Sequence, residues 1–257
     1  MIGTIIGFVL GFFITHKLFG ALFAAFLGYF FYDRNQGSRI SGEQLQQAQG
    51  LFFKTVFNLL GHIAKADGHI SEMEVKLTEA YMDKMGLTAE HKREAIRLFK
   101  EGASADFNLQ ESLNAYRNIG ARSPNLSQML LVYLINLAMV DGALDAKEVE
   151  LLQQVASGIG FSRTAFEQLI RMVGAQNSFA SGQQTSKNDL ALAYEALGVS
   201  AEATDADIKK AYRKLMSQYH PDKLMGQGLP EDMIKAATER SQEIQAAYDL
   251  ITKSRAR

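Results

Sequence analysis

The first 32 residues are almost entirely apolar, and from residue 43 onward the apolar positions recur with helical spacing. The N-terminal run is long enough to cross a bilayer, so residues 1–32 are interpreted as an anchor with its span at about 5–31. At about 1.5 Å per residue this helix is roughly 40 Å long and would tilt or place its ends among lipid headgroups. His16 and Lys17 divide the run into pieces too short to cross separately, which favours a single transmembrane helix.

Charged residues in and after this run predict its orientation. Lys17 lies near its middle, at a cost of roughly 2.5–3.5 kcal/mol unless it snorkels, faces a partner helix or meets a water defect. A single tolerated charge is the simplest interpretation. No basic residue precedes the run, as a cleaved signal peptide would require, whereas Arg34, Arg39 and Lys54 follow it. The positive-inside bias therefore predicts a cytoplasmic location for the rest of the chain.

Small residues recur at every fourth position within the run. Such stripes let two helices approach closely, so one hypothesis is a homodimer through the transmembrane helix. Ordinary glycine enrichment in membrane helices explains the same pattern. The candidate positions are Gly3, Gly7, Gly11, Gly20, Ala24 and Gly28.

The central region follows a juxtamembrane segment at 33–49 and contains an internal repeat. Apolar periodicity predicts helices near 43–66, 72–85, 88–101, 108–120, 125–140, 146–157 and 162–173. A self-match at an offset of 74 indicates a duplicated helix-turn-helix unit in an all-α bundle. In this match Leu60, Ala64, Asp67, Gly68, Glu74, Val75, Leu77 and Gly86 recur as Leu134, Ala138, Asp141, Gly142, Glu148, Val149, Leu151 and Gly160.

Each copy has an Asp-Gly turn followed by a helix start. Ser71 with Glu74, and Asp145 with Glu148, have the spacing of a capping box, so a structural role explains these polar residues. The pattern resembles the TerB-like (tellurite-resistance) helical domain over about residues 50–175. That resemblance implies a metal site as the alternative to the caps, although the spaced ligands of an EF-hand are missing. The candidate ligands are Asp67, Glu74, Asp141 and Glu148.

The C-terminal part of the chain is predicted to form a separate helical domain. The apolar period is lost after Gly174, which predicts a flexible linker at 176–188 and a domain at 189–257. A first short helix ends at Gly198, and Thr204 begins a second helix, which Pro221 stops. A third helix can pack on the second as an antiparallel hairpin through Ile244, Ala247, Tyr248 and Ile251.

The second of these helices has two contrasting faces. Its apolar face carries Ile208, Tyr212, Leu215 and Tyr219, and the adjacent face is basic. A basic face alone is usually only solvated, but here the residues His220, Pro221 and Asp222 follow at once. The basic face consists of Lys209, Lys210, Arg213 and Lys214.

The amino-acid composition excludes several kinds of functional site. A net charge of −1 gives no support for nucleic-acid binding, and the absence of Cys excludes a disulfide framework, a thiolate zinc site and a Cys nucleophile. No nucleophile-base pair, phosphate loop or cofactor motif is present, so the sequence predicts neither an enzyme nor a cofactor.

The segment YEALGVSAEATDADIKKAYRKLMSQYHPDK, followed by QEIQAAYDLI, resembles the J-domain across about seventy residues. The resemblance implies a DnaK-type chaperone as partner, with His220, Pro221 and Asp222 as the trigger of its ATP hydrolysis and the basic face as its docking surface. Long cations on one exposed face suit the steering of an acidic surface. Pro221 restricts the backbone, and Asp222 can fix the loop through charge-assisted hydrogen bonds.

The order of the segments resembles that of the membrane-anchored DnaJ-like family of Gram-negative bacteria. This implies a single-pass protein of the inner membrane with a short periplasmic N-terminus. It also implies a co-chaperone that directs its partner to envelope-associated or regulatory clients, which the sequence does not identify. The alternative is a membrane scaffold or stress sensor with a metal-binding TerB-like domain.

Overall fold

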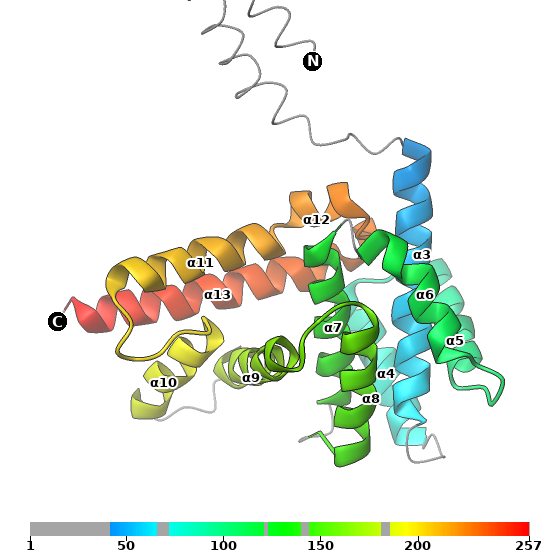
Figure 1. The fold of residues 1–257 in the computed structure, drawn as a ribbon, viewed down its shortest axis with the longest axis horizontal. Coiled ribbons are helices and arrows are strands. Elements are labelled where there is room, and N and C mark those ends of the chain that lie inside the picture. Colours follow the sequence, from blue (N-terminus) through cyan, green and yellow to red (C-terminus); the bar gives the residue numbers. More distant parts are fainter. Residues whose placement is uncertain (1–41, 66–71, 121–122, 140–143, 181–185, 257) are drawn as a thin grey trace, which may run out of the picture. The chain divides into compact units, whose positions relative to one another are not determined.

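The computed structural model describes residues 42–65, 72–120, 123–139, 144–180 and 186–256. The chain divides into two units, Met1–Gln44 and Leu45–Arg257, and nearly all of the described residues belong to the second. They are helical, without a strand, as the sequence predicts (Figure 1). The TerB-like part contains α3 (Gly42–Ala64), α4 (Glu72–Met85), α5 (Ala89–Gly102), α6 (Leu109–Gly120), α7 (Pro124–Ala138), α8 (Ala146–Gly158) and α9 (Arg163–Ala180). The C-terminal part contains α10 (Ser186–Ala196), α11 (Asp205–Tyr219), α12 (Pro221–Gln227), η2 (Glu231–Met233) and α13 (Ile234–Arg255).

Helix α7 lies at the centre of the core. Its sequence is apolar around most of its circumference, which is typical of a helix covered on all sides, and Pro124 occupies its first turn. Eight of its side chains are at most 1% exposed: Leu126, Met129, Leu130, Leu131, Val132, Tyr133, Leu134 and Ile135. The core of the unit is therefore built around this helix.

Helices α3 and α5 approach each other closely at two glycines. A Cβ atom on Gly61 would lie 1.9 Å from the carbonyl oxygen of Phe99, and one on Gly102 would lie 1.8 Å from that of Asn58. Both distances are far below van der Waals contact. Any side chain at either position would push the two backbones apart.

The C-terminal part forms the expected antiparallel hairpin of α11 and α13 (Figure 1). Tyr212 and Tyr248 stack across it with ring centroids 4.2 Å apart. Arg255 donates to the Tyr194 hydroxyl at 2.7 Å and to Asp205 at 2.8 Å, which ties the end of α13 to α10 and α11. These contacts fix the three helices on one another.

The expected linker is largely helical. The sequence assigns 176–188 to a tether, but α9 continues to Ala180 and α10 begins at Ser186, with 181–185 outside the described residues. The apolar period fails here because Gln176, only 1% exposed, takes a buried position and donates to the carbonyl of Ala196 at 2.9 Å. A buried hydrogen bond thus replaces the apolar contact that sequence periodicity detects.

The predicted transmembrane span, 5–31, lies outside the described residues, as do the small-residue positions within it. Within the described ranges, no helix has the length and apolarity needed to cross a bilayer.

We predict opposite effects for two glycine substitutions. Gly102→Ala should lower the free energy of unfolding by about 1–3 kcal/mol, because its methyl group meets the α3 backbone. Gly50→Ala should raise it by about 0.5–1 kcal/mol, because Gly50 lies in helix α3 with open space around it. Urea unfolding followed by circular dichroism measures both. Equal stability of the two variants would contradict the close approach of α3 and α5.

Candidate functional site

The tripeptide His220, Pro221 and Asp222 lies at the junction of two helices. His220 ends α11 in an extended conformation, with φ −61° and ψ 122°, and Pro221 begins α12. The residue before proline disfavours the helical conformation, which explains the break. The side chains of His220 and Asp222 are exposed, so the tripeptide is open to a partner.

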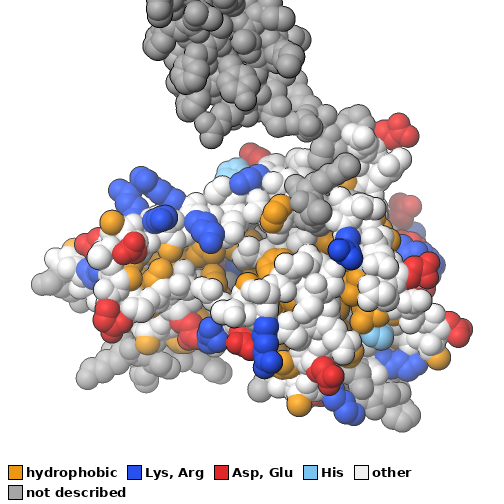
Figure 2. Space-filling view, in the orientation of Figure 1, with side chains coloured by type: hydrophobic (Ala, Val, Ile, Leu, Met, Phe, Trp, Pro, Cys, Tyr) orange, Lys and Arg blue, Asp and Glu red, His pale blue; other side chains and the backbone are white. Residues whose placement is uncertain are grey.

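The basic face lies on the exposed side of α11. Thr204 caps the helix by accepting from the N–H of Asp207 at 3.2 Å, and Ile208, Leu215 and Tyr219 are buried on the other side. Figure 2 shows Lys and Arg side chains gathered over this helix. In the described part of the chain, no acidic side chain pairs with any of the four cations, Lys209, Lys210, Arg213 and Lys214. Their charge therefore remains available to an acidic partner.

Asp222 does not hold the tripeptide in the way the sequence suggests. Its carboxylate has no hydrogen bond or ion pair with the residues described. Instead, the stretch after the tripeptide is buried. Leu224, Leu229 and Met233 are fully buried, and we call residues 224–233 the HPD-flanking segment. Packing behind the tripeptide takes the place of the expected bonds.

The HPD-flanking segment is bonded to the TerB-like helices. The hydroxyl of Tyr133 donates to the carbonyl of Met233 at 2.6 Å, and Gln49 donates to that of Leu229 at 3.4 Å. Burial raises the pKa of Tyr133 well above its ordinary value, so this hydroxyl keeps its proton as donor. Gly228, with φ +118°, lies so close to Ala48 that a Cβ atom would come within 2.9 Å of the alanine methyl. The segment therefore rests on α3 and α7.

A buried arginine joins the C-terminal helices to α7 and α9. Arg240 is 3% exposed, and its charge is balanced by Glu243 at 2.8 Å. It also donates to Gln176 at 2.6 Å and to Asn136 at 3.3 Å. A buried charge is costly unless it is paired and hydrogen-bonded, as it is here. This cluster holds α13 on the TerB-like part.

A second polar contact between the two parts lies near the surface. The carboxylate of Asp232 is bonded to the His91 ring and accepts from the N–H of Thr88 at 3.5 Å. Partial burial opposes ionisation, but the bonds from His91 and Thr88 outweigh it and lower the pKa of Asp232 below its ordinary 3.8. The ionised carboxylate is thus the form that stabilises this contact.

One of the two predicted capping boxes is confirmed. Asp145 accepts from the N–H of Glu148 at 2.8 Å, and the Glu148 carboxylate accepts from the N–H of Asp145 at 2.9 Å. Ser71 and the side chain of Glu74 lie outside the described residues, as do Asp67 and Asp141. Among the residues that are described, no group of three or more His, Asp or Glu could hold a metal ion. The proposed metal site stays a prediction.

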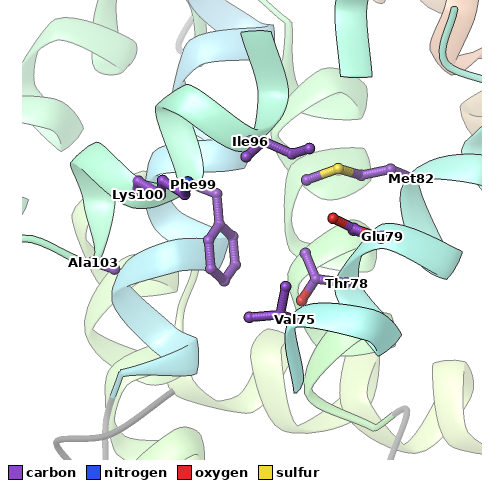
Figure 3. Close-up of a pocket in the computed structure, with 8 residues that line it drawn as sticks. All are labelled: Val75, Thr78, Glu79, Met82, Ile96, Phe99, Lys100 and Ala103. Carbon is purple, nitrogen blue, oxygen red and sulfur yellow. The ribbon is translucent and has the colours of Figure 1, made fainter. Parts of the chain in front are cut away.

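An apolar groove of about 220 Å³ lies between α4 and α5 (Figure 3). Its lining includes the buried side chains of Met82 and Phe99, and that of Val75, which is 43% exposed. Val149, at the matching position of the second repeat, is 37% exposed. The two valines thus share their exposure as well as their place in the repeat.

Sequence reasoning identifies the tripeptide and the basic face but misses their support. Three residues of this support belong to no motif: Tyr133, Gln176, and Gln128, which donates to the hydroxyl of Tyr219 at 2.8 Å. Arg240 does carry a signal, because it falls in phase with a stripe of buried apolar residues on α13. That stripe is Ala237, Ile244, Ala247 and Ile251.

Two known protein families match the chain, one in its central part and one in its C-terminal part. Residues 54–171 match the tellurite resistance protein TerB family, and residues 192–257 match the DnaJ domain family. The chain is therefore a J-domain protein with a TerB-like domain. J-domain proteins act with DnaK-type chaperones and are not themselves enzymes.

Similar chains identify the family more closely. The co-chaperone protein DjlA of Shewanella oneidensis is 39% identical over 87% of both chains, and that of Coxiella burnetii is 39% identical over 99% of this chain and 98% of its own. The DjlA of Vibrio parahaemolyticus is 42% identical over 82% of this chain and 81% of its own. No solved structure matches. The chain belongs to the DjlA family of co-chaperones.

We predict that Asp232→Asn lowers the free energy of unfolding by about 1 kcal/mol at neutral pH, because the bond to His91 loses its charge. The pKa of Asp232 is lower in the folded chain, so its contribution is present above the ordinary 3.8 and is lost as the pH falls through the lower value. Urea titrations of both proteins over a pH series that runs from neutral down through the folded-state pKa of Asp232 test this. If the two proteins still differed in their free energy of unfolding at a pH where the carboxyl group of Asp232 is protonated in the folded chain, the prediction would be contradicted.

Proposed function

We propose that this chain stimulates ATP hydrolysis by a DnaK-type chaperone and directs that chaperone to envelope-associated or regulatory clients. The observation that carries the proposal is the exposed His220-Pro221-Asp222 tripeptide at the end of α11, next to four cations that pair with no acidic side chain among the residues that the structure describes. The basic face steers and aligns an acidic surface of the chaperone, and the tripeptide then acts on it. The ATP-hydrolysing site belongs to the partner.

Two kinds of residue have separate roles in this proposal. The cations Lys209, Lys210, Arg213 and Lys214 set how tightly the chaperone docks, through long-range attraction that salt weakens. The tripeptide His220, Pro221 and Asp222 sets how much the docked chaperone is stimulated. Substitutions in the two groups should therefore change different parameters of the same titration.

We predict that His220→Gln in the full chain abolishes the stimulation of DnaK ATP turnover while the protein stays folded. The side chain is exposed, so its replacement removes no core contact. Steady-state ATP hydrolysis measured against co-chaperone concentration gives the maximal rate, and circular dichroism gives the fold. Full stimulation by the folded variant would defeat the proposal.

A matched pair of charge reversals gives the control. Lys210→Glu should raise the half-stimulating concentration several-fold, most strongly at low salt, and leave the maximal rate nearly unchanged. Lys147→Glu changes net charge equally at an exposed position on α8 and should have no effect. Equal effects of the two variants would show that net charge, and not the α11 surface, matters.

We further propose that residues 1–32 hold the chain in the bacterial inner membrane as a single-pass anchor. The apolar length of the span supports this, and the following basic residues support a periplasmic N-terminus with the bulk of the chain in the cytoplasm. Homodimerisation through Gly3, Gly7 and Gly11, or through Gly20, Ala24 and Gly28, is part of the same proposal. An anchor restricts the partner chaperone to clients near the membrane.

We predict that the full chain stays in the membrane pellet after alkaline carbonate extraction and that a chain lacking residues 1–32 does not. The 27-residue span at 5–31 is apolar except around Thr15, His16 and Lys17, so its transfer from lipid to water is strongly unfavourable and it resists extraction. Cross-linking of the same membranes reports on the dimer. Release of the full chain by carbonate would contradict the anchor.

A further inference from the structure

The HPD tripeptide is held at its flanks and not by its own side chains. On its N-terminal side, Tyr219 is 2% exposed, and its hydroxyl accepts from Gln128 at 2.8 Å. On its C-terminal side, Leu224 is fully buried, and the HPD-flanking segment continues to Met233, whose carbonyl accepts from Tyr133. The side chains of His220 and Asp222 bond nothing in the part of the chain that the structure describes. The conformation of the tripeptide is therefore decided by what holds its two flanks.

One helix of the TerB-like part reaches both flanks. Gln128 and Tyr133 lie on α7, separated by about 7.5 Å of helix rise. This helix is fixed in the core, because most of its side chains are excluded from solvent. Since a packed helix does not deform continuously, it holds the two flanks at a constant separation. Helix α13 adds a third attachment, where Ser241 donates to the carbonyl of Tyr219 at 3.1 Å.

We propose that Gln128 and Tyr133 of α7 are positioning residues for the HPD tripeptide, so that the TerB-like domain is part of the apparatus that stimulates the chaperone. The inference rests on the proposed function only for its effect on ATP turnover. The restraint on the HPD-flanking segment is a property of this chain alone.

The bonds from Gln128 and Tyr133 affect how the HPD tripeptide is presented to the chaperone, and they do not affect how the chaperone docks on the basic face of α11. Loss of either bond leaves the four cations of α11 in place, because that helix is also held by α13. It lets the flank of the tripeptide sample other conformations, and only part of the population then presents His220 correctly. The maximal stimulation should therefore fall while the half-stimulating concentration stays the same.

The test uses Tyr133→Phe and Gln128→Leu in the full chain. Hydrogen exchange is followed at the amides of Leu224 and Leu229, which donate to the carbonyls of His220 at 3.0 Å and Leu224 at 2.9 Å. Each variant should speed their exchange by about fivefold, the equivalent of one hydrogen bond. The amide of Ile208, which donates to Thr204 at the start of α11, should exchange as before. Maximal DnaK stimulation should fall by up to about fivefold at an unchanged half-stimulating concentration.

Tyr116→Phe is the matched control, because Tyr116 is equally buried but lies on α6 and bonds no atom of the HPD-flanking segment. It should change neither measurement. Unaltered exchange at Leu224 and Leu229 in Tyr133→Phe and Gln128→Leu would overturn the proposal, and so would faster exchange with undiminished stimulation. If His220→Gln itself stimulated fully, the proposed function would fail, whereas the exchange result would still decide whether α7 holds the segment.

Discussion

The contact on which the rest of the structure depends is the packing of α7 against the segment after the HPD tripeptide. Leu224, Leu229 and Met233 have no solvent exposure, and each exchanges water for protein contacts at a gain of about 1.5–3 kcal/mol. The hydrogen bond from the Tyr133 hydroxyl to the Met233 carbonyl also fixes the orientation of this segment on α7. The J-domain is consequently docked on the TerB-like helices, and the exposed HPD tripeptide has a fixed base.

Charge is used in two different ways on the two sides of the J-domain. Towards α7 and α9, Arg240 is buried and fully engaged by Glu243, Gln176 and Asn136. Towards solvent, the four cations of α11 stay unpaired within the described residues. Breaking a buried pair is strongly destabilising, whereas an exposed cation costs little to leave free. The same domain therefore has one permanent face and one face suited to a partner that binds and leaves.

The sequence predicts the helices and the HPD tripeptide because both leave local signals. Helices α3 to α8 agree with their predicted ranges to within a few residues, since apolar positions at helical spacing report burial on one side. His220, Pro221 and Asp222 are found by motif. The docking of the two parts leaves no such signal, because Gln128 and Gln176 are polar residues whose hydrogen-bond partners, Tyr219 and Ala196, lie elsewhere in the sequence. Arg240 is the exception, as its place in an apolar stripe marks it as a buried charge that requires a partner.

The most direct test of this docking measures the distance between the two domains in solution. The chain has no cysteine, so cysteines introduced at the exposed positions Lys147 on α8 and Lys210 on α11 would carry the only spin labels. Dilution with unlabelled chain keeps each labelled pair within one molecule. Double electron–electron resonance on the full chain should give a single narrow distance distribution, as expected for a J-domain docked through Arg240 and α7. A broad distribution, typical of a domain on a flexible tether, would contradict the docking.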